Sequence, residues 1–178
     1  MNITLRNIIR RATLATVVLL LSFGIAGAQI DLRISKSKIK SSLNRLDKLE
    51  LLAAQLNTAS GSTQAAAAQL CQIAKQCKEL SESISHYINQ VNVLGTLQAS
   101  SEKVLQRTLL LTKLDSLSKE LASHKESISS IGSSIMSTGA SSKALNSIGA
   151  KIIKIAEKEY LYQAMAVGNM ISALGTMQ

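Results

Sequence analysis

Residues 110–135 read LLTKLDSLSKELASHKESISSIGSSI. Apolar residues and one histidine recur in this stretch at alternating steps of four and three, namely at Leu110, Leu114, Leu117, Leu121, His124, Ile128, Ile131 and Ile135. This spacing places all of them along one side of an α-helix, with Ser, Lys, Asp and Glu around the rest of its circumference. Such a stripe needs partner helices to cover it, and the flanking sequence supplies them.

Three other segments have the same periodicity. In residues 31–57 the apolar positions are Leu32, Ile39, Leu43, Leu46, Leu49 (or Glu50), Ala53 and Leu56. In residues 64–97 they form a pattern typical of coiled coils, at Leu70, Ile73, Cys77, Leu80, Ile84, Tyr87, Val91 and Leu94. In residues 142–177 they are Leu145, Ile148, Ile152, Ile155 (or Ala156), Tyr160, Ala164, Val167, Ile171 and Leu174. Short connections rich in Ser and Gly, with Gly139 as the clearest break, predict turns between these helices.

The predicted fold class is therefore all-α. We expect an elongated antiparallel bundle of three to four long helices, formed by residues 29–178 as a single domain. The composition agrees, because the chain of 178 residues has no Pro and no Trp, and Leu, Ile, Ala, Ser and Lys dominate.

Residues 1–28 have the three parts of a secretory signal peptide. Three arginines form a basic start, residues 14–25 are almost wholly apolar, and residues 26–28, Ala-Gly-Ala, form a cleavage site of small residues. We therefore expect a mature chain that begins at Gln29 and is exported to the periplasm or the cell surface. The alternative is an uncleaved membrane anchor, although the apolar run is short for a stable span.

The chain is basic, with a formal net charge of +9 that falls to +6 once the three leader arginines are removed. Lysines and arginines concentrate between residues 33 and 48, which would suit nucleic acid or anionic lipid but is also typical of a solvated helix face. After the leader, Tyr87, Tyr160 and Tyr162 are the only aromatic residues, so bases would find almost no platform for stacking. We expect no nucleic-acid partner, while membrane contact stays open.

Cys71 and Cys77 are the only cysteines, and an oxidising compartment would favour a disulfide between them. Six residues of a straight helix rise about 9 Å, which exceeds the Cα separation that a disulfide allows. The bond would therefore need a kink or break in the helix. The alternatives are two free thiols or pairing with another chain. The spacing is not that of a zinc site, so we expect no metal.

No catalytic constellation is present in the sequence. No serine stands in a strained glycine turn, the carboxylates are scattered over exposed faces, and there is no Gly-rich phosphate loop. We therefore expect neither enzyme activity nor a cofactor. His124 could be a pH-sensitive group, but we favour a partly solvated seam residue that is hydrogen-bonded to a neighbour.

The C-terminal stretch 160–178, YLYQAMAVGNMISALGTMQ, contains no charged residue. Ala164, Gly168 and Ser172 are small residues at four-residue steps, a spacing that lets helix backbones approach closely. Met165 and Met170 add adaptable apolar surface. These five residues form the candidate docking surface for another subunit or a membrane. The alternative is that this helix is simply buried in its own bundle.

The same stretch carries a family resemblance. Its residue pairs at 163–164, 168–169 and 173–174 (Gln-Ala, Gly-Asn and Ala-Leu), with the leader and the helical layout, resemble the periplasmic minor pilins of type IV secretion and conjugation systems. The resemblance implies an elongated bundle at a pilus tip or in pilus assembly, with other envelope or secretion-system subunits as partners.

The expected function is that of an exported, non-enzymatic protein that acts through protein–protein contacts, and oligomerisation stays open. The alternative is a membrane-associated or membrane-active helical protein, such as a small toxin or an envelope scaffold that uses the basic first helix and the uncharged tail.

Overall fold

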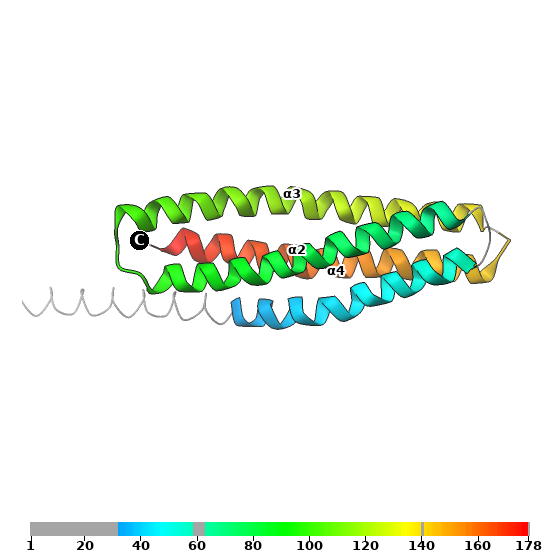
Figure 1. Ribbon diagram of the computed structural model, residues 1–178, viewed down its shortest axis with the longest axis horizontal. Coiled ribbons are helices and arrows are strands. Elements are labelled where there is room, and N and C mark those ends of the chain that lie inside the picture. Colours follow the sequence, from blue (N-terminus) through cyan, green and yellow to red (C-terminus); the bar gives the residue numbers. More distant parts are fainter. Residues whose placement is uncertain (1–31, 59–62, 140, 178) are drawn as a thin grey trace, which may run out of the picture.

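The computed structural model describes residues 32–58, 63–139 and 141–177. Within these ranges every regular element is a helix: one over 32–58, then α2 (Gln64–Thr96), α3 (Ser101–Thr138) and α4 (Lys143–Thr176). The helices lie side by side in an elongated bundle, and each runs antiparallel to the one before it (Figure 1). The prediction of an all-α helical bundle is confirmed. The predicted leader, residues 1–28, lies outside the described residues.

Local sequence explains where the last two helices begin and where α3 ends. The Ser100 hydroxyl accepts a hydrogen bond from the backbone N–H of Lys103, and Ser142 does the same for Leu145, so each serine satisfies a free N–H group of a first turn. Gly139 ends α3, as predicted, with a φ of −95°. A Cβ at Gly139 would collide with the Leu145 side chain, so the glycine is needed for space rather than for a left-handed backbone.

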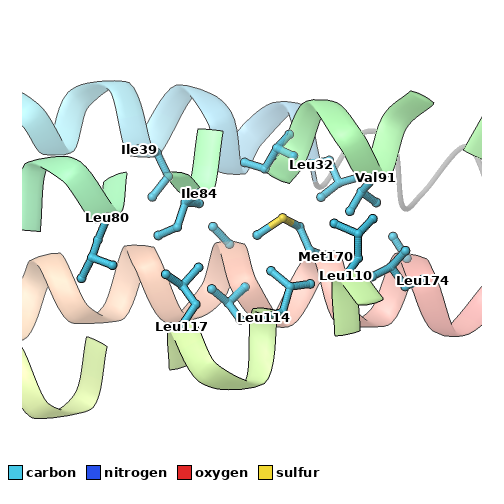
Figure 2. Packing of buried hydrophobic residues seen from close by; sticks show 14 of the residues in the cluster. Leu32, Ile39, Leu80, Ile84, Val91, Leu110, Leu114, Leu117, Met170 and Leu174 are labelled. Atoms are coloured by element: carbon cyan, nitrogen blue, oxygen red, sulfur yellow. The ribbon is translucent and has the colours of Figure 1, made fainter. Parts of the chain in front are cut away.

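Two apolar clusters fill the bundle, one in each half of its length. The cluster toward the α2–α3 connection draws on all four helices through residues such as Leu32, Ile84, Leu114 and Met170 (Figure 2). The cluster toward the other end does so through residues such as Leu49, Leu70, Ile131 and Ile152. Each helix therefore buries apolar surface along most of its described length, which is the main stabilisation of the bundle.

The predicted apolar stripes of the first three helices agree with the buried faces, with small departures. In the stripe of residues 110–135 every member is buried except His124, which is half-buried. In the 32–58 helix Leu49 rather than Glu50 is buried. In α2 the predicted stripe contained Tyr87, which is half-buried, and the neighbouring Ile88 is buried in the core instead.

The inner face of α4 differs in part from the stripe predicted for its C-terminal half. Ala164 is only half-buried and Ile171 is 39% exposed, whereas Met170 lies in the core. The buried face also includes Glu159 and Gln163. The predicted stripe therefore passes beside these two polar residues, at Tyr160 and Ala164, which are half-buried, whereas its members Val167 and Leu174 are buried as predicted.

The helices α3 and α4 approach each other closely at a pair of buried glycines. A Cβ on Gly149 would lie 2.6 Å from the carbonyl oxygen of Gly132, and a Cβ on Gly132 would lie 2.9 Å from the carbonyl oxygen of Gly149. Only residues without a side chain allow two backbones to come so close. This contact is part of the most extensive packing among α2, α3 and α4.

Candidate functional site

A polar layer separates the two apolar clusters near the middle of the bundle. Glu159 of α4 is 3% exposed, and it accepts hydrogen bonds from the Ser42 hydroxyl and the Arg45 guanidinium of the 32–58 helix. The guanidinium carbon of Arg45 lies 4.7 Å from the centre of the Tyr162 ring. Because an unpaired buried charge is costly, sliding the 32–58 helix by one turn along α4 would be disfavoured.

Further polar contacts of α4 follow toward its C-terminal end. The Gln163 amide donates a hydrogen bond to the Ser81 hydroxyl at 2.8 Å and to the backbone oxygen of Cys77 at 3.5 Å. Nearer the C-terminal end, the Asn169 amide donates to the Ser35 hydroxyl at 2.9 Å. Gln163 and Asn169 belong to the uncharged stretch 160–178, and both side chains form hydrogen bonds within the bundle.

The expected disulfide is not formed in this structure. Cys71 is half-buried, Cys77 is buried, and both are free thiols. They lie on α2, which continues from Gln64 to Thr96 without the break that a bond between them would require. Burial, together with the negative charge of Glu159, raises the pKa of the Cys77 thiol to about 12. This thiol therefore stays protonated near neutral pH and is a poor nucleophile.

His124 occupies the gap between the two apolar clusters on α3, with Leu121 on one side and Ile128 on the other. Its side chain is half-buried, as expected for a seam residue. Its Nδ1 atom is buried and has no hydrogen-bond partner among the described residues, so the predicted bond to a neighbour is not present at that atom.

The five candidate docking residues differ in how far they are buried in the structure. Met170 is fully buried in the apolar cluster toward the α2–α3 connection (Figure 2), so its assignment to a docking surface is wrong. It follows Gly168 by two positions, or about 200° around the helix, and therefore faces the opposite side. Ala164 is half-buried, whereas Met165, Gly168 and Ser172 are exposed.

Together with Leu161, the three exposed residues form what we call the outer apolar strip of α4: Leu161, Met165, Gly168 and Ser172. Leu161 is 54% exposed and Met165 is 43% exposed. A Cβ on Gly168 would meet no atom within 4 Å. α4 therefore packs in the bundle with one face and leaves this strip on its other face exposed.

Two kinds of site are missing from the described ranges. No group of three or more His, Cys, Asp or Glu side chains that could hold a metal ion occurs in residues 32–58, 63–139 and 141–177. Over the same ranges, no helix has an apolar stretch long enough to cross a bilayer.

Four hollows that the described residues line between helices are open grooves at the surface. No family model matches the chain, and no match to it was found among curated proteins or solved structures.

Proposed function

We propose that this protein is exported and acts without catalysis, through protein–protein contacts in an envelope, secretion or conjugation assembly, in the manner of a minor pilin. The observation that carries the proposal is the outer apolar strip of α4. Leu161 and Met165 leave apolar surface in water that the fold does not use, and such surface is a common mark of an interaction site.

The shape of the strip supports a protein partner. The space above Gly168 is open, so the backbone of a second helix can approach α4 more closely there than at a larger residue. The signal-peptide pattern of residues 1–28 supports export, and the resemblance of residues 160–178 to minor pilins supports an envelope assembly.

The test is Gly168→Leu, with Ser123→Leu as the matched control on an exposed position of α3. Because neither leucine meets a filled core, neither variant should be less helical or melt at a lower temperature than the wild type by circular dichroism. Gly168→Leu should lose co-purification with envelope or secretion-system subunits, and Ser123→Leu should retain it. Normal co-purification by both variants would contradict the proposal.

A further inference from the structure

A groove of about 390 Å³ lies between the 32–58 helix and α4. Three lysines and three apolar residues contribute to its lining: Lys48, Lys151, Lys154, Leu51, Leu52 and Ile155. Leu51 is 60% exposed, so part of the apolar lining is open to solvent. The groove thus combines apolar surface with positive charge and has no carboxylate in its lining.

The positive charge of this groove is not neutralised by the protein itself. Asp47 and Glu50 of the 32–58 helix both pair with Lys78 of α2, at 2.7 and 2.9 Å. Those two hydrogen bonds raise the pKa of Lys78. Glu159 is buried against Arg45. In the part of the chain that the structure describes, no carboxylate forms an ion pair with a lysine of the groove.

The outer face of α4 extends the groove. Lys151, Lys154 and Lys158 follow one another at steps of three and four, and the next step of three reaches Leu161 in the outer apolar strip. All four residues are exposed. Glu157 lies three positions after Lys154, about 60° around the helix, so one exposed carboxylate flanks the line of lysines. Along its length, this face changes from basic to apolar.

We propose that the groove and the outer apolar strip together bind an acidic amphipathic helix of another protein. Carboxylates at steps of three and four on such a helix would meet the lysines, and apolar side chains beside them would cover Leu51 and Leu161. Complementary charge would set the orientation and the rate of association. This inference rests on the proposed function and specifies the chemistry of the partner.

A second copy of this chain is a poor occupant of the groove. The exposed carboxylates of α3, at positions 102, 115, 120 and 126, are interspersed with lysines such as Lys113 and Lys119, and Lys119 already pairs with Asp115 at 2.7 Å. Without the three leader arginines the chain carries a net charge of +6. Two copies would therefore bring positive charge against positive charge.

An anionic membrane also fits this face less well than a helix does. The outer apolar strip contains neither Trp nor Phe, and its members Gly168 and Ser172 offer little apolar area for insertion between lipids. The same two small residues favour close contact with a helix backbone. The partner expected from this chemistry is therefore a protein.

The experiment uses a fluorescent amphipathic peptide of about 20 residues, with a row of Glu beside a row of Leu on the same face, which spans about 30 Å as a helix. Binding to the purified protein is followed by anisotropy. The double variant Lys151→Glu/Lys154→Glu should bind the peptide at least about tenfold more weakly than the wild type. The matched control Lys75→Glu/Lys119→Glu changes the net charge equally at exposed positions outside the groove and should bind like the wild type.

Three results would overturn the inference: no binding of the peptide to the wild type, equal weakening in both double variants, or binding to phosphatidylglycerol vesicles that only the groove variant loses while peptide binding is unaffected. Co-purification with envelope subunits separates the two proposals. If the groove variant co-purifies normally while Gly168→Leu does not, the inference fails and the proposed function stands. If Gly168→Leu also co-purifies normally, the proposed function fails.

Discussion

Two glycines of α4 have opposite surroundings. Gly149 is buried, and a Cβ there would lie 2.6 Å from the carbonyl oxygen of Gly132 on α3. Gly168 is exposed, and a Cβ there would meet no atom within 4 Å. The same residue type on the same helix thus permits close packing at one position and leaves a surface open at the other. A small residue in a helical sequence does not itself reveal which role it has.

The largest difference in stability is expected between two alanine variants, one at a leucine inside the bundle and one at a leucine on its outer side. Leu117 is 5% exposed and packs in the first cluster, so Leu117→Ala should lower the free energy of unfolding by about 2–5 kcal/mol. Leu161 is 54% exposed, and Leu161→Ala should change it by no more than about 0.5 kcal/mol. Urea unfolding of both variants measures the difference. Equal costs would mean that α4 has no free outer face.

An intermediate effect is expected at the close contact of α3 and α4. In Gly149→Ala the new methyl group would press on the backbone of Gly132 as well as on the Met136 side chain, and a backbone oxygen cannot turn away. We expect a loss of about 1–3 kcal/mol from overpacking, despite the better helix propensity of alanine. Thermal unfolding would record it, and an unchanged melting temperature would show that the helices are further apart than described.

The smallest effect should have the opposite sign. Gly168→Ala adds a methyl group where nothing is in contact, and alanine is the better helix former by about 1 kcal/mol in a helix interior. The variant should therefore be up to about 1 kcal/mol more stable than the wild type, in the same assay as Gly149→Ala. A loss of stability in both variants would remove the distinction between the two faces of α4.

Much of the fold was predictable because apolar spacing reports helices that are buried along one side. Leu110, Leu114 and Leu121 follow one another in the sequence at helical steps, and the structure buries all three. The start of the last helix at Ser142 was predictable, since its cap depends on a backbone N–H only three residues further on.

The polar parts of the bundle were not predictable in this way. Glu159 is buried because Ser42 and Arg45, more than a hundred positions away, come to lie beside it. Polar residues on a helix are read as exposed by default, so the stripe predicted for α4 passed to one side of Glu159 and Gln163. The docking candidates failed at Met170 for the same reason, because the rotation of α4 was assigned from its apolar residues alone.

The sequence by itself determined that the chain forms long helices, roughly where they end, and which side of the first three is apolar, because these depend on interactions within a few residues. Only the tertiary structure decided which glycine of α4 is packed, which side of its C-terminal half faces water, and that Lys48 lines one groove with Lys151 and Lys154. These features arise from helices that meet across long sequence separations, and their rotation is set by all four packing at once.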